Sequence, residues 1–169
     1  MTNEAKTKWF HQTLADQQLK LISYTHKILR NKEQSKEVVQ ESYCKLWLQE
    51  YPAITLLIPP WLYRVCRNHS IDILRKENRL TPIDLEDGSI FMIGVDFDNV
   101  ADSAIALKEI NKLNPKHKEA LILKFSHDLS YKEIAKIMNI TTSHVGVLIH
   151  EGILEVRKSL GLTKQGGQS

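Results

Sequence analysis

The stretch S-Y-K-E-I-A-K-I-M-N-I-T-T-S-H-V-G-V-L-I (residues 130–149) is the most informative part of the sequence. Its apolar residues recur at intervals of three and four, which indicates amphipathic helices on both sides of a short break at residues 139–141. Ser130 and Glu133 have the spacing of a capping box, so a helix begins there. Asn139 tolerates the left-handed backbone of a tight turn. The spacing predicts a helix-turn-helix, although an ordinary helical hairpin fits it as well.

The same periodicity continues through most of the chain, and no segment alternates polar and apolar residues as a strand does. We therefore predict an all-α protein. The expected helices cover residues 6–30, 36–50, 60–79, 104–113, 116–126, 130–138 and 142–160. We expect Ser35 to cap the second helix, Pro60 to lie in the first turn of the third, and Gly161 to end the last.

Charge divides the 169 residues into three parts. Residues 1–79 hold 13 basic and 8 acidic side chains, whereas residues 80–104 hold six acidic side chains and no Lys or Arg. Residues 105–169 hold 10 basic and 6 acidic side chains. We predict two helical domains, 1–79 and 105–162, joined by a flexible acidic linker at 80–104 and followed by a disordered tail at 163–169.

The composition excludes several classes of protein. With 42% hydrophobic and 25% charged residues the chain is typical of folded globular proteins, and no apolar run is long enough to span a membrane. The N-terminus lacks a secretory signal pattern, so we expect a cytoplasmic protein. Cys44 and Cys66 are too few for a disulfide scaffold, and no Cys or His pair has metal-ligand spacing. Without a phosphate loop or a nucleophile motif, we expect no enzymatic activity, no cofactor and no metal.

The expected helix 60–79 has two chemically different faces. Its predicted core stripe consists of Leu62, Cys66, Ile73 and Leu80. The opposite face collects guanidinium and amide groups, from Arg64, Arg67, Asn68, Arg75, Asn78 and Arg79, with Ile71 among them. Such groups bind phosphates and base edges, and the rings of Trp61 and Tyr63 are suited to stacking on unpaired bases. The alternative is a solvated basic face beside two core aromatic residues.

Four segments in a fixed order form a larger pattern. They are K-E-V-V-Q-E-S-Y-C-K-L-W (36–47), W-L-Y-R-V-C-R-N-H-S-I-D-I-L-R (61–75), L-N-P-K-H-K-E-A-L-I-L-K-F (113–125) and L-S-Y-K-E-I-A-K-I-M-N-I (129–140). In this order and spacing, the chain resembles a bacterial RNA polymerase sigma factor of the sigma-70 family, extracytoplasmic-function (ECF) group. The first segment looks like the core-polymerase-binding helix and the second like the melting and minus-10 helix. The last two resemble the minus-35 domain.

The resemblance implies a non-enzymatic subunit that binds the RNA polymerase core, at the β′ clamp and the β subunit, and helps to open promoter DNA. The DNA contacts then include the single-stranded non-template strand. The residues it assigns to core polymerase are Val39, Gln40, Glu41 and Trp47, although core packing is the preferred interpretation of Val39 and Trp47. The residues it assigns to DNA are Trp61, Tyr63, Arg64, Asn68 and Arg75. To these we add Arg67 and Arg79 from the polar face of the same helix, and Thr142, Ser143 and His144 at the start of the final helix.

The sequence departs from this family pattern in two places. Residues 142–156 contain no Lys or Arg, and residues 51–60 are aliphatic where the family has a more polar base-capturing loop. Val147 and Leu154 fall on the outward side of the final helix with Glu151 between them, which favours protein docking as well as unusual DNA reading. We hypothesise weak autonomous promoter recognition and dependence on a partner, either an anti-sigma factor or a DNA-targeting, RNA-guided recruiter. A helix-turn-helix regulator that never binds polymerase is the rival function.

Overall fold

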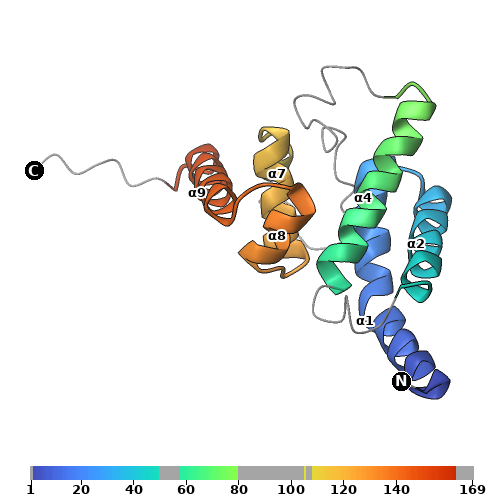
Figure 1. Ribbon diagram of the computed structural model, residues 1–169. Coiled ribbons are helices and arrows are strands. Elements are labelled where there is room, and N and C mark those ends of the chain that lie inside the picture. The colour runs from blue at the N-terminus through green and yellow to red at the C-terminus, as the bar shows by residue number, and fades with distance from the viewer. Residues whose placement is uncertain (1, 50–57, 80–104, 106–107, 163–169) are drawn as a thin grey trace, which may run out of the picture. The chain divides into compact units, whose positions relative to one another are not determined.

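The computed structural model describes residues 2–49, 58–79, 105 and 108–162, and all regular structure in these residues is helical (Figure 1). The all-α prediction is therefore confirmed. The elements are α1 (Asn3–Leu29), α2 (Lys32–Trp47), α4 (Ile58–Lys76), α7 (Pro115–Leu121), the π-helical turn η3 (Ile122–Ser126), α8 (Tyr131–Met138) and α9 (Thr142–Ser159). Of the helix expected at 104–113, residues 105 and 108–111 are helical among those described. The predicted linker and tail lie outside the described residues.

The described residues fold as two compact units, the first containing α1, α2 and α4 and the second containing α7, η3 and α9. In the first unit α1, α2 and α4 pack against one another in all three pairs. The fully buried core includes Leu21, Tyr24, Ile28 and Leu29 of α1, Leu46 of α2, and Leu62, Tyr63 and Cys66 of α4. Because each such apolar side chain contributes about 1.5–3 kcal/mol when it leaves water, this core stabilises the arrangement of the three helices.

The start of α2 differs from the prediction. The N-cap is Asn31, whose Oδ1 accepts a hydrogen bond of 3.0 Å from the backbone N of Gln34. Ser35, the predicted cap, is buried in the first turn and donates its hydroxyl to the backbone O of Asn31 at 2.7 Å. Asn and Ser are both good caps, and the helix begins one turn earlier because Asn31 comes first in an extended conformation.

The buried side of α4 is also displaced from the predicted stripe. Ile73 is partly exposed and Leu74 is buried instead, so the buried row runs through Leu62, Cys66, Ser70 and Leu74. The residues of this row are four apart. The buried side of α4 is wider than a single row because α4 packs on both α1 and α2. Leu80 lies outside the described residues. Pro60 lies in the first turn of α4, as predicted.

Helices α8 and α9 form the predicted helix-turn-helix. The capping box is confirmed, since Ser130 N donates to Glu133 Oε2 at 2.8 Å and Glu133 N donates to Ser130 Oγ at 3.2 Å. Asn139 has the left-handed φ of 56° after the end of α8, and Thr141 caps α9 by accepting a bond from His144 N. The predicted helix 116–126 corresponds to α7 followed directly by η3. Gly161 follows α9 with a φ of 69°, as predicted.

Close packing of α7 on α9 depends on one glycine. A Cβ at Gly152 would lie 3.0 Å from Leu121 Cδ1 and 3.3 Å from its Cγ. The two helices therefore approach more closely than a larger residue permits. Leu121, Val145, Leu148 and Ile149 are buried in the same unit, which fixes α9 on α7 and leaves the opposite side of α9 exposed.

Candidate functional site

Helix α4 carries the predicted DNA-binding face, and most of that face is exposed. Arg64, Asn68 and Arg75 are exposed, and Arg67 is half-buried. Arg75 Nη1 lies 3.6 Å from Asp72 Oδ1, and more than half of each side chain is exposed, so the pair is weak and its guanidinium can turn toward a phosphate. The face offers guanidinium and carboxamide groups in water, which is the chemistry that binds phosphates and base edges.

The two aromatic residues at the start of α4 have different environments. Trp61 is partly exposed, and its ring remains a candidate for base stacking. Tyr63 is fully buried, with its ring centroid 4.9 Å from that of Tyr24 on α1. The prediction that Tyr63 stacks on a base is therefore wrong for this fold. Residues two apart on a helix point in nearly opposite directions, by about 200°, so these two rings cannot share one face.

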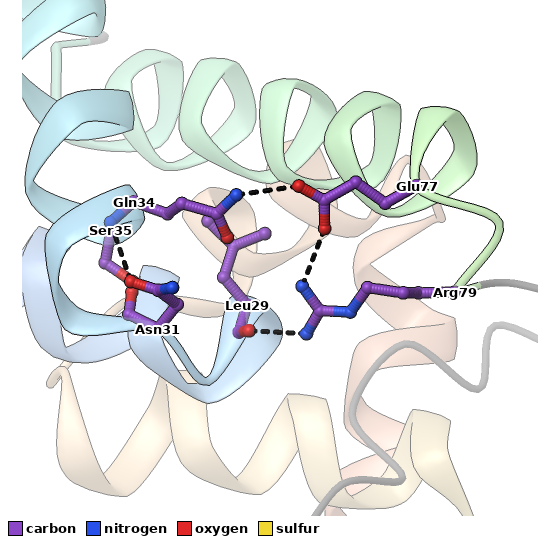
Figure 2. Close-up of polar contacts among 6 residues, drawn as sticks. All are labelled: Leu29, Asn31, Gln34, Ser35, Glu77 and Arg79. Atoms are coloured by element: carbon purple, nitrogen blue, oxygen red, sulfur yellow. Dashed lines mark hydrogen bonds and ion pairs between the residues drawn. The ribbon is translucent and has the colours of Figure 1, made fainter.

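Arg79 makes contacts within the fold that the sequence does not predict. It belongs to a cluster that we call the Arg79 clasp, consisting of Gln34, Glu77 and Arg79 (Figure 2). Arg79 Nη2 donates to the backbone O of Leu29 at 2.7 Å, and Nη1 donates to Glu77 Oε2 at 3.0 Å. Gln34 Nε2 donates to Glu77 Oε1 at 2.8 Å. The bonds from Arg79 and Gln34 lower the pKa of Glu77 and keep it a carboxylate. The Arg79 guanidinium thus serves the fold, and its predicted contact with DNA stays a prediction.

The predicted polymerase-binding residues lie on α2. Gln40 and Glu41 are exposed, and Glu41 Oε2 lies 3.4 Å from His69 Nδ1 on α4. Val39 is buried, which agrees with the preferred interpretation of core packing. Trp47 is partly buried, with its ring centroid 5.0 Å from that of Phe10 and Lys6 Nζ 4.6 Å from its ring. Glu41 and Gln40 are thus the predicted residues that remain accessible to a partner.

A groove of about 500 Å³ lies beside these residues, between α1 and α2. Its lining residues are Phe10, Leu14, Gln18, Ile22, Lys36, Val39, Gln40, Tyr43 and Cys44. The apolar walls and polar rim are typical of grooves that accept the side chains of another helix. The α1 side of this groove is not predicted from the sequence. The only signal in α1 is the regular spacing of its apolar residues, and that spacing is equally typical of a helix face that packs in the core.

The outward side of α9 is accessible in the part of the chain that the structure describes. Thr142, Ser143 and His144 are exposed in the first turn. Val147 and Leu154 are 49% and 45% exposed, large fractions for aliphatic side chains. Glu151, between them, has Oε2 2.8 Å from His117 Nε2 on α7, so its carboxylate is held at one position. The predicted strip is thus exposed, and its docking role stays a prediction.

Further features of the described residues concern metal-binding clusters, cysteine pairs and membrane-spanning helices. Among the residues described, no group of three or more His, Cys, Asp or Glu side chains could hold a metal ion. Both cysteines are free thiols, and burial raises the pKa of Cys66 to about 11, so this thiol is a packing group. No helix in the described part of the chain is long and apolar enough to cross a bilayer.

The comparisons with known proteins agree with one another. Residues 110–158 match the family described as Sigma-70, region 4. The chain is 27% identical over 155 residues to the ECF RNA polymerase sigma factor SigW of Bacillus subtilis (strain 168), covering 83% of each protein. It is 28% identical over 123 residues to the ECF RNA polymerase sigma factor SigM of the same organism, covering 68% of this chain and 72% of SigM.

A solved structure matches the fold. It is the sigma factor RpoE from Bartonella quintana in complex with the anti-sigma factor NepR, with a TM-score of 0.64 and 19% sequence identity. The match covers 93% of this chain and 99% of that one. At this identity the likeness concerns the fold alone, and it extends over both helical units.

Proposed function

We infer that this chain, which carries a sigma-70 region 4 domain and is homologous to ECF sigma factors, acts as an RNA polymerase sigma factor in transcription initiation. The observation that carries this function is the homology, which extends over 83% of the chain and thus beyond the helix-turn-helix unit. A regulator that has only a DNA-binding unit in common with sigma factors would align with them over a smaller part of its chain. The first unit supports the same function, since it combines an exposed cationic helix with a groove suited to a partner.

On the polymerase side, we assign the contact to the exposed part of α2 and the groove beside it. Gln40 and Glu41 supply polar groups, and the apolar walls of the groove receive aliphatic side chains from the β′ clamp. Val39 and Trp47 support this surface from within. The carboxylate of Glu41 lies beside one imidazole and is otherwise solvated, so a cationic side chain of polymerase finds it accessible.

On the DNA side, we assign promoter contact to the exposed face of α4. Arg64 and Arg75 neutralise phosphates, and the Asn68 amide reads a base edge on the opened non-template strand. Unpairing a base costs a few kcal/mol, and stacking on Trp61 offsets about 1–3 kcal/mol of it. Binding energy thus drives opening, while RNA synthesis takes place in the polymerase core. Such a protein works in the cytoplasm, where polymerase and chromosome are.

The second unit is assigned a weaker part in promoter recognition. Thr142, Ser143 and His144 present hydroxyl, imidazole and amide groups at the N-terminus of α9, where a phosphate is favoured. However, the first cations of this helix are Arg157 and Lys158 in its last turn. We therefore assign the exposed strip from Val147 to Leu154 to a protein partner. This partner is either an anti-sigma factor or a recruiter that targets DNA, for example an RNA-guided protein. The β subunit of polymerase is a further partner of this unit.

Retention by purified core polymerase tests the function. The wild-type chain is expected to form a complex, and Glu41→Lys is expected to weaken it at least about tenfold because a charge contact becomes a repulsion. Glu33→Lys, the same charge change two turns earlier on α2, is the matched control. If the wild-type chain is not retained while it still binds DNA, the regulator function replaces the sigma-factor function. A circular dichroism spectrum of each variant shows that the helices persist.

A further inference from the structure

The Arg79 clasp joins all three helices of the first unit at one end (Figure 2). Leu29 is the last residue of α1, Gln34 lies in the first turn of α2, and Glu77 and Arg79 follow the end of α4. The bond from Arg79 to Leu29 spans 50 residues of sequence, and the bond from Gln34 to Glu77 spans 43. The clasp is therefore a tertiary connection and not a local cap.

The groups in the clasp suit their positions. The last carbonyls of a helix have no partner within it and carry partial negative charge, so a guanidinium near Leu29 O is favoured. Arg79 uses two nitrogens of one rigid plane for two acceptors, which a lysine ammonium cannot reproduce with the same geometry. Each bond involves a charged group and is stronger than a neutral hydrogen bond. The side chain of Arg79 is about one-third exposed, at 34%, so water weakens these bonds without removing them.

The backbone around the clasp turns sharply on both sides. Arg30 after α1 and Asn78 after α4 each have a φ of 55°. Asn78 N donates to Arg75 O at 3.2 Å, and Arg79 N donates to Leu74 O at 2.8 Å, which closes the end of α4. The end of α4 is thus held by its own backbone and by the clasp. Arg75, on the proposed DNA face, lies one turn before this point.

We propose that Arg79 is a positioning residue for promoter opening, and this rests on the sigma-factor function proposed above. Through the clasp, Arg79 fixes the direction of α4, which carries the proposed DNA contacts, against α2, which carries the proposed polymerase contacts. Opening a duplex requires both sets of contacts at once. Groups that already have the right orientation lose no binding energy to reordering. Arg79 therefore promotes opening without touching DNA.

The test compares Arg79→Ala with Arg75→Ala, which removes the same charge from the same end of α4. Each full-length variant is assembled with polymerase core, and complex formation is measured on a duplex selected from a random library by the wild-type holoenzyme. The same sequence with a pre-melted bubble is the second template. Arg79→Ala is expected to lower opening of the closed duplex about tenfold, which corresponds to loss of one charge-assisted hydrogen bond. Binding of the bubble template is expected to fall less than about twofold.

The salt dependence separates positioning from contact. Arg75→Ala is expected to reduce the slope of log affinity against log salt by about 0.7–0.9, as loss of one phosphate contact does, whereas Arg79→Ala leaves the slope unchanged. A slope reduced by Arg79→Ala overturns the proposal. The proposal is also overturned if Arg79→Ala lowers opening of the closed duplex and binding of the bubble template equally, and by no more than the loss of folded protein explains. Gln34→Ala and Glu77→Gln each remove one bond with less risk to folding, and the same preference for the closed template is expected from both.

Failure of the proposed function is distinguishable from failure of this proposal. If the wild-type chain does not join core polymerase, the function itself is wrong. If it joins and opens DNA while Arg79→Ala opens the closed duplex equally well, only the positioning role is wrong.

Discussion

The ring of Tyr63 on α4 packs against the ring of Tyr24 on α1, with centroids 4.9 Å apart and planes inclined by 65°. Both side chains are fully buried. This edge-to-face pair lies where α1 and α4 meet and adds to the stability gained from burial. Trp61, two residues earlier, is partly exposed, so of these two aromatic residues only Trp61 has a ring surface available for the proposed base stacking.

Tyr63→Ala is expected to lower the free energy of unfolding by about 3–5 kcal/mol, because it leaves a cavity in the core. Trp61→Ala is expected to weaken binding of single-stranded promoter DNA by about 1–3 kcal/mol, with a smaller loss of stability. Urea unfolding measures the first effect and fluorescence anisotropy the second. A Tyr63→Ala protein of unchanged stability that loses DNA binding would show that Tyr63 contacts the bases after all.

Val147→Lys and Leu154→Lys are expected to abolish partner-dependent transcription while core polymerase binding stays intact. The reason is that each places a charge in the exposed aliphatic strip of α9. Ser159→Lys, which adds the same charge at the exposed end of α9, is the control. Reporter transcription with and without the candidate partner gives the measurement. Unchanged output rules out delivery by the strip, and tighter DNA binding with a steeper salt slope assigns the strip to DNA.

Gly146→Ala and Gly152→Ala are expected to change stability in opposite directions. A Cβ at Gly146 would lie 3.6 Å from Tyr131, an ordinary contact, so alanine stabilises α9 by up to about 1 kcal/mol. At Gly152 the 3.0 Å approach to Leu121 forces the helices apart, and overpacking costs about 1–3 kcal/mol. Thermal unfolding of the two variants compares them directly. Equal increases would mean that Leu121 moves aside freely.

Lys27→Met is expected to raise stability at pH 7 and to lose this advantage as the pH rises. Burial lowers the pKa of Lys27 from 10.5 to about 8. Between these values the unfolded chain binds more protons than the folded one, so the contribution of Lys27 to stability increases with pH. Denaturant unfolding at pH 7 and pH 9.5 measures the difference between variant and wild type, with the exposed Lys20→Met as control. A difference that grows with pH would contradict the burial of the charge.

Much of the second unit could be predicted from short-range signals. The capping box at Ser130, the left-handed Asn139 and the apolar spacing around the break all act over four residues or fewer, and each was found where expected. The cap of α2 was placed one turn late because Asn31 and Ser35 are comparable signals. The π-helical turn at η3 has no such signal, since its residues also suit an α-helix.

The candidate site was predicted less completely, because burial depends on residues far away in the sequence. A helical wheel orders the residues of α4 but does not say how wide a side its two neighbours cover. It therefore does not show that Tyr63 is buried while Trp61 is partly exposed, and it selects Ile73 in place of the buried Leu74. Arg79 looks like any exposed cation until Leu29 and Gln34 are brought beside it. The groove is likewise not predicted, because its lining comes from both α1 and α2, which only the fold brings together.

Several helices of this chain end on side chains where glycine is the usual residue. Arg30, Asn78 and Asn139 have φ values of 55°, 55° and 56°, and among the described residues only Gly161 is a glycine with positive φ. A side chain in this conformation costs roughly 1–2 kcal/mol, less for asparagine. The thermal stability of the protein is therefore below what its fold allows. A more heat-resistant version for laboratory use is more readily obtained by placing glycine at these helix ends than by adding new contacts.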